Sequence, residues 1–567
     1  MNKRYSVKLK QLPLQTPVVA ALLLAFVPLA AVGQAIPGAG MILQEIKPVQ
    51  PALPSASGTA LTIQQEGGAR LPPSAPFPVK SIRISGNTVF DTATLHALLT
   101  EAEGKSLTLQ QLDALASRIS DYYHAHGYPL ARALIPAQTI ATGIVRIDIL
   151  EAHYGKITLD NHSRVNDPLL LATLAPLQGG QAIQQARLDH ALLLLSDMPG
   201  VVVNATLKPG QGVGSSDLLV DTTSGPALTG NVALDNDGNR YTGRARVGAT
   251  FNFIDPLRHG DILSVSGLSS GSGMNYGRLS YEALLTGQGT RLGGSWSALR
   301  YSLGQPLAAL DAHGSAEVAS LWARHPLRRS RDANLYGQIQ YDGLQLRDHV
   351  DANALRTDRQ LKNWTASLSG DARDSLLSGG ASAWNLGLTR GRVGFDDASA
   401  QLADAATART EGSFSKWNAN LVRLQNLGSA NSVYLSVSGQ WANGNLDASQ
   451  KMVAGGPYSV RAYDMGALSG DTGATATAEL RHELGAAWNG QWQVLAFIDS
   501  AHLTINKTPW VAGANSATLS GAGLGLSWAG PNRWSARTYV AAPFGTRPAL
   551  VAGSASVRAW VEIGRGF

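Results

Sequence analysis

Alternation of apolar and polar residues dominates the chain from residue 226 onward. Segments of about ten residues, such as 334–342, 432–441 and 533–542, carry apolar side chains on one face and polar side chains on the other. Because successive residues of a strand point to opposite faces, this period of two predicts strands. A soluble β-sandwich would alternate as well, but repetition over residues 226–567 favours a transmembrane antiparallel β-barrel.

The last expected strand supports a closed barrel. Every second residue from Val557 to Ile563 is apolar, as is the terminal Phe567, and we expect this row to face lipid. Trp560 and Phe567 are interpreted as the C-terminal barrel signal. The last strand must pair with the first, because an open edge in lipid would leave backbone groups without hydrogen bonds.

Residues 76–225 have a different pattern, in which an order of one strand, two helices and two strands occurs twice. The elements of the first copy, residues 76–153, are expected at 79–84, 91–99, 112–122, 130–135 and 143–150. Those of the second copy, residues 154–225, are expected at 157–159, 168–174, 186–195, 201–207 and 217–221. Asp91 can cap the first helix. The predicted fold class is therefore mixed, with two tandem α+β modules before the barrel.

The N-terminus has the form of a secretory signal. Four basic residues precede an apolar run, Val18 to Val32, and small residues follow it, so we expect residues 1–35 to be a cleaved signal peptide. Residues 36–75 are rich in proline and are expected to form an extended, poorly packed linker. Within this linker, residues 40–46 are compatible with a short helix.

Composition narrows the function further. Of 46 basic and 40 acidic residues, four basic ones lie in the signal peptide, so the mature chain has a net charge of +2 and does not resemble a nucleic-acid binder. All 12 tryptophans lie between Trp296 and Trp560, within the expected membrane part, and tryptophan prefers the membrane interface. There is no cysteine, and the histidines lack metal-ligand spacing. A Gly-x-Ser-x-Gly pattern at 267–271 lacks the following helix that a hydrolase needs. We therefore expect no catalytic residue, cofactor or metal.

Several segments resemble the transporters of two-partner secretion systems, a branch of the outer-membrane insertase superfamily. The segments HGYPLARALIPAQTIATGIVRIDILEA (126–152) and LLLLSDMPGVVVNATLKPGQGVGSSDLLVD (192–221) resemble its polypeptide-transport-associated (POTRA) modules. LDNDGNRYTGRARVGATFNFIDPLRHGDIL (234–263) is similar to the opening of its barrel. The resemblance covers nearly the whole mature chain. It implies a barrel of sixteen strands, and it implies that residues 40–46 form a helix that plugs the pore.

The most specific match is GGPYSVRAYDMGALSGDTG (455–473), which resembles the inward-folding loop of this family. The tip motif of that loop, Val-Arg-Gly-Tyr in the family, is Val460-Arg461-Ala462-Tyr463 here. A second family motif, Phe-x-Asp-x-Gly, is present as residues 497–501, from Phe497 to Ala501. Alanine thus replaces glycine in both motifs.

The resemblance implies that the loop-tip Arg461 meets Asp499 on the inner barrel wall, next to Phe497. The apolar row of residues 492–498 independently places Asp499 on the lumen side, where a carboxylate avoids a cost of a few kcal/mol in lipid. From periodicity alone, each of these residues would be one of many solvated lumen charges.

The resemblance implies an outer-membrane translocator with its modules in the periplasm. Such a protein captures an unfolded partner and secretes it through the pore without being an enzyme. The expected partner is a large exoprotein, namely a β-helical adhesin, a cytolysin or a contact-dependent toxin. The remaining expected partner is outer-membrane lipid, and we expect a monomer. An insertase for other barrel proteins and a passive porin stay as alternatives, although a porin would not explain the modules.

Overall fold

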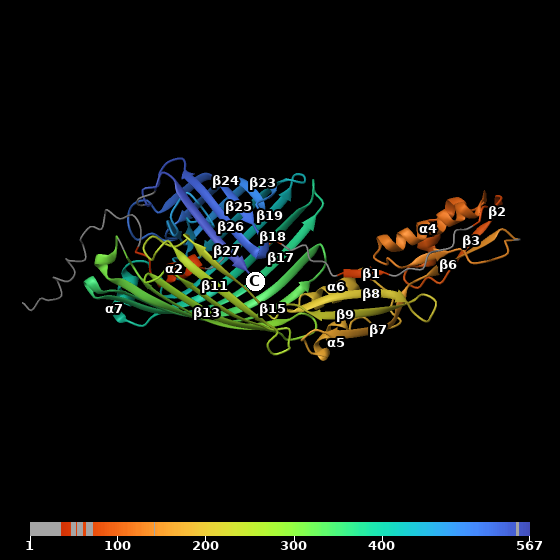
Figure 1. Cartoon of the computed structure of the whole chain (residues 1–567), viewed down its shortest axis with the longest axis horizontal. Helices are drawn as coiled ribbons and strands as arrows, with labels where there is room; N and C mark the ends of the chain where they lie inside the picture. The colour runs from red at the N-terminus through yellow and green to blue at the C-terminus, as the bar shows by residue number, and fades with distance from the viewer. Residues whose placement is uncertain are drawn as a thin grey trace, which may run out of the picture.

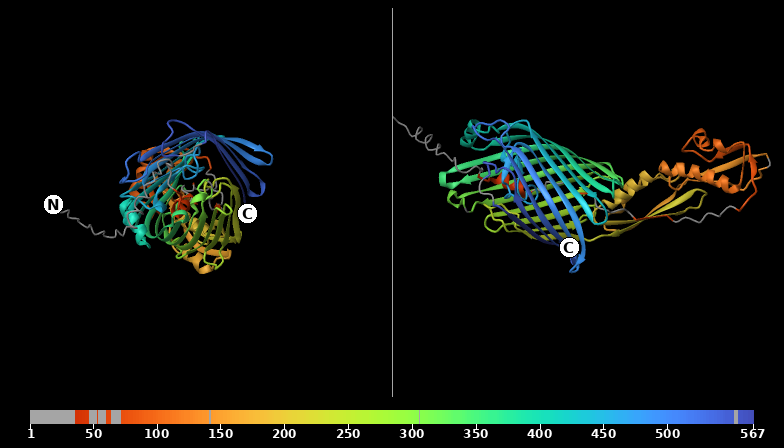
Figure 2. Two further views of the ribbon diagram at one scale, coloured as in Figure 1. Left: turned by 90° about the vertical axis from the view of Figure 1, so that its left-hand side faces the viewer. Right: turned by 90° about the horizontal axis from the view of Figure 1, so that it is seen from above.

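The computed structural model describes residues 36–46, 53, 60–63, 72–140, 142–304, 306–551 and 555–567. The expected signal peptide and most of the expected linker lie outside these residues. Two small modules extend in a row from one end of a large barrel (Figure 1), and the view from above in Figure 2 shows the same arrangement. In the described part of the chain, no helix is long and apolar enough to cross a membrane.

The barrel is a closed antiparallel sheet of sixteen strands, which confirms the predicted number. Its first half contains β10 (Leu228–Asp235), β11 (Arg246–Ile254), β12 (Ile262–Ser269), β13 (Met274–Leu284), β14 (Arg291–Ser302), β15 (Ala312–Arg328), β16 (Ala333–Val350) and β17 (Leu355–Asp374). Its second half contains β18 (Gly380–Phe395), β19 (Gly412–Asn426), β20 (Asn431–Ala442), β23 (Thr472–Ala487), β24 (Gly490–Thr504), β25 (Ser516–Ala529), β26 (Trp534–Pro543) and β27 (Arg558–Gly566). The loop between β18 and β19 carries a helix, α7 (Ala398–Ala406), at the end away from the modules (Figure 1).

The first and last strands close the barrel. Residues Asn231–Asp235 of β10 pair with Glu562–Gly566 of β27, and Gly230 exchanges two backbone hydrogen bonds with Phe567. The Phe567 ring faces outward beside Phe251, with ring centroids 5.7 Å apart. Trp560 points into the lumen instead and is 2 % exposed. The two residues of the expected C-terminal signal therefore lie on opposite faces of β27.

The first module has the predicted strand, two helices and two strands in that order, and it also has a two-stranded sheet of β2 and β4 that was not predicted. It contains β2 (Phe77–Val79), β3 (Ser81–Ser85), α3 (Thr92–Ala97), β4 (Lys105–Leu107), α4 (Leu109–Ala125), β5 (Arg132–Leu134) and β6 (Ile144–Leu150). In its main sheet β6 lies between β3, which is parallel to it, and β5, which is antiparallel. Asp91 caps α3 as predicted, and Thr108 and Gln111 form a capping box that starts α4.

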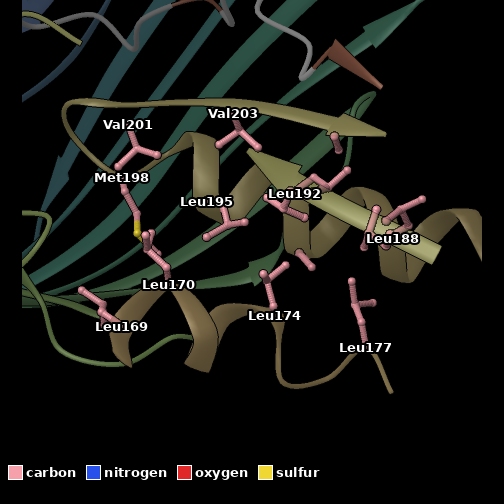
Figure 3. Packing of buried hydrophobic residues seen from close by; sticks show 14 of the residues in the cluster. Leu169, Leu170, Leu174, Leu177, Leu188, Leu192, Leu195, Met198, Val201 and Val203 are labelled. Carbon is pink, nitrogen blue, oxygen red and sulfur yellow. The ribbon is translucent and has the colours of Figure 1, made fainter. Parts of the chain in front are cut away.

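The second module repeats this topology. It contains β7 (His153–His162), α5 (Asp167–Leu174), α6 (Gln185–Ser196), β8 (Val201–Pro209) and β9 (Ser215–Ser224). Here β9 lies between the parallel β7 and the antiparallel β8. Leucines of both helices pack against valines of β8 in the hydrophobic core of this module, as Figure 3 shows.

The linker contains a strand that local sequence did not predict. β1 (Ala60–Ile63) pairs in parallel with residues 204–207 of β8, and Leu61 packs against the core of the second module. The prediction of a poorly packed linker is therefore wrong for this segment. The free edge of β8 recruits it because an unpaired edge leaves backbone N–H and C=O groups without partners.

The second module is fixed to the barrel at the turns nearest to it. Arg329, after β15, donates two hydrogen bonds to Asp197 at 2.6 and 2.8 Å, and Arg331 pairs with Asp189 at 2.7 Å. Leu284 of β13 belongs to the core of the module. A bidentate arginine–carboxylate pair holds orientation as well as distance, so the module and this side of the barrel move together.

Candidate functional site

The loop between β20 and β23 folds back into the lumen. It carries a two-stranded hairpin, β21 (Met452–Ala454) with β22 (Leu468–Gly470), and its tip lies deeper inside. All four residues of the tip motif are at most 3 % exposed, and a hydrogen bond from Tyr463 N–H to the Val460 carbonyl closes the turn at 3.1 Å. The structure thus brings residues 460–463 to the inner barrel wall.

Arg461 and Asp499 are in direct contact inside the barrel. The Arg461 Nε–H and Nη2–H groups donate to the two carboxylate oxygens of Asp499 at 2.9 and 2.7 Å, and the Arg461 backbone N–H donates to the same carboxylate at 3.0 Å. Thr477 donates a further hydrogen bond to it at 3.0 Å. Asp499 is fully buried, so its charge is compensated by hydrogen bonds rather than by water.

A second carboxylate completes the site. Arg461 Nη1–H donates to Glu479 on β23 at 2.6 Å, and Arg481 neutralises the other oxygen of Glu479 through its Nε–H at 2.8 Å. The Arg461 guanidinium also lies 3.4 Å above the Phe497 ring. Two arginines, two carboxylates and one aromatic face thus form a nearly neutral buried cluster, and such a cluster loses several kcal/mol when one charge is removed.

Alanine fits at both motif positions where the family has glycine. Ala462 does not have a positive φ, so its backbone needs no conformation reserved for glycine. Its methyl group faces Gly521 of β25, where an added Cβ would lie only 2.4 Å from it. Ala501 is buried in the cluster of apolar residues under the loop. The contact between loop tip and barrel wall is therefore intact in this chain.

The loop also contacts the last strand of the barrel and the connection between β10 and β11, and sequence reasoning missed these contacts. The Trp560 indole N–H on β27 donates to the Arg461 carbonyl at 2.7 Å. Asp464 pairs with Arg558 of β27 at 2.6 Å and with Arg244, which precedes β11, at 2.8 Å. Arg558 and Trp560 are two residues apart on β27 and therefore both face the lumen, and this spacing in the sequence could have indicated the contacts.

A helix lies inside the barrel where the sequence favoured one. α2 (Ala39–Ile46) lies within the barrel outline in both figures of the whole chain, and it contacts β14, β15, β16 and the short helix η5 (Ala448–Gln450). The carboxylate of Asp348 on β16 accepts a hydrogen bond from the Ala39 N–H at 2.7 Å. An anionic group at this position stabilises the first turn of a helix.

The other end of α2 is held by loops. Gln44 donates to the Ser449 carbonyl, and Asn239, which precedes β11, donates to the Glu45 carboxylate at 2.8 Å. The Asp348 carboxylate is itself shared with Arg359 at 2.7 Å. Polar contacts thus anchor the helix to the barrel wall and to two loops. The side chains of Ala39, Ile42 and Leu43 also pack in a buried apolar cluster with lumen-facing residues of the barrel.

Two other features of the sequence lie away from the lumen cluster. The Gly-x-Ser-x-Gly pattern at 267–271 covers the end of β12 and the start of the turn to β13, so no helix follows Ser269. In the second module, Asp160, His162 and Asp221 bring one ligand atom each within 4.8 Å of one another. His162 and Asp160 are two residues apart on β7, a spacing that sequence reasoning had not taken for a metal pattern. All three lie at the surface, and we assign no metal to them.

Comparison with known proteins identifies the family. Residues 214–528 match the family described as "Haemolysin secretion/activation protein ShlB/FhaC/HecB", and residues 77–152 match the "POTRA domain, ShlB-type". The chain belongs to this family of two-partner secretion transporters. The family resides in the outer membrane with its modules in the periplasm, and it secretes partner exoproteins through the barrel. It is a family of transporters and not of enzymes.

Relatives in other bacteria extend over most of the chain. The Haemophilus influenzae protein "Heme/hemopexin transporter protein HuxB" is 27% identical over 447 residues, which are 78% of each chain. "Outer membrane transporter CdiB" of Dickeya dadantii is 24% identical over 482 residues, 81% of each chain. Among solved structures, CdiB from Escherichia coli shares the fold with a TM-score of 0.69 at 20% identity, covering 90% of this chain and 94% of that one.

Proposed function

We propose that the lumen cluster around Arg461 and Asp499 is the lock that keeps the inward loop in its resting position. Four hydrogen bonds join Arg461 to two carboxylates on neighbouring strands, and this single observation carries the proposal. The tip contacts β23, β24 and β27 together through Arg461, so breaking the cluster weakens the hold of all three strands on the loop. Passage of a polypeptide requires the loop and α2 to give up lumen space.

The two modules are proposed to capture the partner in an unfolded state. Their sheets offer strand edges, and an extended segment can add to such an edge through backbone hydrogen bonds. The β8 edge is occupied by β1 over residues 204–207, whereas no strand among the described residues pairs with the outer edges of β3 and β5. There, Glu103 and Ser120 side chains accept hydrogen bonds from one backbone N–H of each strand, and an added strand would replace these contacts. Capture of a chain in extended form delivers it to the pore mouth in a state that can pass through.

The proposed partner is one large exoprotein, and the proposed transporter is a monomer, with the barrel closed within one chain. A β-helical adhesin, a cytolysin and a contact-dependent toxin are candidate partners. The likeness to a relative named for haem and hemopexin adds an exoprotein that handles haem. Helix α2 is proposed to plug the pore between transport events.

The test is deletion of this chain in its native host, followed by comparison of proteins in the medium. We expect one large protein to disappear from the medium while outer-membrane proteins stay at their normal level. General loss of outer-membrane barrels would instead support the insertase alternative. An unchanged set of secreted proteins would support a passive porin.

A further inference from the structure

Three cations on the outer, lipid-facing wall of the barrel form no ion pair with any residue that the structure describes. They are Lys362 on β17 and Arg390 and Arg392 on β18, and we refer to them as the outer cation cluster. All three are exposed, while the neighbouring residues Leu361, Gly391 and Val393 are buried toward the lumen. Since side chains alternate along a strand, the cluster points away from the pore and toward the membrane.

The geometry of this cluster is unfavourable for the protein alone. Lys362 and Arg392 are directly opposite each other in the ladder between β17 and β18, and Arg390 is opposite Trp364. Side chains at such positions have Cβ atoms about 5 Å apart, and like charges there repel. Among the described residues, no carboxylate forms an ion pair with any of the three, because Asp396 accepts from Gln345 and Gln360 and Asp358 pairs with His349.

At the opposite end of the same strands, an outward-facing cation is paired with a carboxylate of the protein. There the outward-facing Arg423 of β19 forms an ion pair with Asp374 of β17 at 2.9 Å. Arg423 at the module end thus has its anion within the protein. At the far end, no carboxylate in the described part of the chain pairs with the three cations, which leaves room for an anion from the surroundings.

The position of the cluster relates it to one leaflet. Trp364 follows Lys362 by two residues toward the modules, and Tyr341, Trp364, Trp417 and Trp441 form an aromatic row along the outward faces of β16, β17, β19 and β20. Aromatic rows of this kind mark the headgroup level of a membrane. Because the modules are periplasmic, the cluster lies at the headgroups of the outer leaflet.

A groove for a hydrocarbon chain begins directly below the cluster. It has a volume of about 600 Å³, and its walls include Ile339, Ala366, Leu368, Leu386, Leu388 and Trp417. Leu388 lies next to Arg390 on the outward face of β18, so the groove and the cations are continuous. Small side chains such as Ala366 between larger ones create the depth that an acyl chain can fill.

From these observations we propose that the outer wall of β15–β19 binds lipopolysaccharide, the phosphorylated glycolipid of the outer leaflet. Its phosphate groups lie among Lys362, Arg390 and Arg392, and one of its acyl chains lies in the groove below. The phosphates remove the repulsion between Lys362 and Arg392. The site holds the wall opposite the closing seam of β10 and β27 in a fixed lipid environment.

The test uses the full-length protein purified in mild detergent, with purified lipopolysaccharide as the probe. The test variant combines Arg390→Ala with Arg392→Glu. The glutamate stands opposite Lys362 and forms an ion pair with it, so this variant folds even though it rejects phosphate. The control is Arg565→Ala, which removes an exposed cation from the outer wall at the module end of the barrel. Heat-modifiable migration on gels checks the barrel in each protein.

We expect the test variant to bind lipopolysaccharide at least about tenfold more weakly than wild type, because it lacks two of the three cations that attract the phosphates and carries one anion that repels them. The control should bind as wild type does, and dephosphorylated lipid A should bind wild type as weakly as the test variant. Equal binding by the test variant and wild type would overturn the proposal. Equal binding of phosphatidylglycerol and lipopolysaccharide to wild type would also overturn it, since a general anionic surface would then explain the cluster.

Discussion

The methyl group of Ala462 at the loop tip fits against Gly521 on the barrel wall, which has no side chain to obstruct it. An added Cβ at position 521 would lie 2.4 Å from the Cβ of Ala462, well inside van der Waals contact. Asp499 is the ladder partner of Gly521, so the same spot of the wall binds both the arginine and the alanine of the tip. Gly521 of β25 therefore leaves the space that the loop tip occupies.

Filling this space should displace the loop tip. We predict that Gly521→Ala lowers secretion of the partner severalfold and destabilises the resting loop by about 1–3 kcal/mol, the usual cost of overpacking. Gly277→Ala is the matched control, because an added Cβ there meets nothing within 4 Å. Partner in the medium is quantified by immunoblot. Wild-type secretion by the Gly521→Ala variant would show that the close fit of the tip is not needed.

Removing the loop-tip charge should impair export while the barrel stays folded. Arg461→Ala leaves Asp499 and Glu479 buried without a shared cation, which costs about 3–5 kcal/mol for the local arrangement. Arg461→Lys should fail nearly as much, because lysine cannot donate in the bidentate geometry observed here. Secretion is compared with that of Arg423→Ala, which breaks an ion pair on the outer wall. Normal export by the Arg461→Ala variant would show that the lumen cluster does not act as the proposed lock.

Loosening α2 should open the pore more often. Asp348→Asn replaces the carboxylate that accepts a hydrogen bond from the first helical N–H of α2 by a neutral amide. The control is Asp342→Asn, which changes another lumen-facing carboxylate of the same strand, one that accepts hydrogen bonds from Ser320 and Gln340. In planar bilayers we predict more frequent open events for Asp348→Asn, and a higher mean conductance still when residues 36–60 are deleted. Conductance that is unaffected by the deletion would show that α2 does not plug the pore.

Glu151, between the two modules, should make the first module sensitive to acid. Burial opposes its ionisation, but hydrogen bonds from Thr88, Tyr123 and Val89 outweigh burial and lower the pKa of Glu151. A carboxylate with a lowered pKa contributes stability at neutral pH, and this stability is lost as the pH falls through the pKa of the folded state.

This effect can be measured by hydrogen exchange in the full-length protein. Protection of the backbone N–H groups of Thr88 and Val89 should hold from neutral pH down to the ordinary pKa of a glutamate, about 4.5, and should fall as the pH drops below that value. In Glu151→Gln the protection should be lower at neutral pH and should change little with pH. A wild-type protein whose protection at these residues is independent of pH would contradict the assignment.

Sequence patterns predicted the barrel and the modules well because both depend on local periodicity. Alternation identified the faces of β16, β20 and β26, and the spacing of apolar residues identified α4 and α6. The same reasoning could not find β1, because its four residues pair with β8 more than a hundred residues further along the chain. Only the three-dimensional position of a free edge decides such a pairing.

Prediction of the lumen cluster was partial for a related reason. The resemblance supplied Arg461 and Asp499, whereas Glu479 was missing from the expected site and Trp560 was expected only as part of the C-terminal barrel signal. Glu479 lies on a strand where alanine and leucine alternate with Thr475, Thr477 and Arg481, so its lumen orientation was readable from the sequence. The contact between Glu479 and Arg461 could not be predicted from the sequence, since it depends on how far the loop extends into the lumen.

The central claim is that the partner passes through the lumen, and disulfide capture tests it most directly. The natural chain has no cysteine, so a single cysteine reports one position. Thr365 and Ala366 are consecutive on β17 and face the lumen and the lipid respectively. A partner that carries one cysteine and a folded domain that arrests it in transit should cross-link to Thr365→Cys and not to Ala366→Cys. Cross-linking to neither position, or to Ala366→Cys alone, would contradict transport through the barrel.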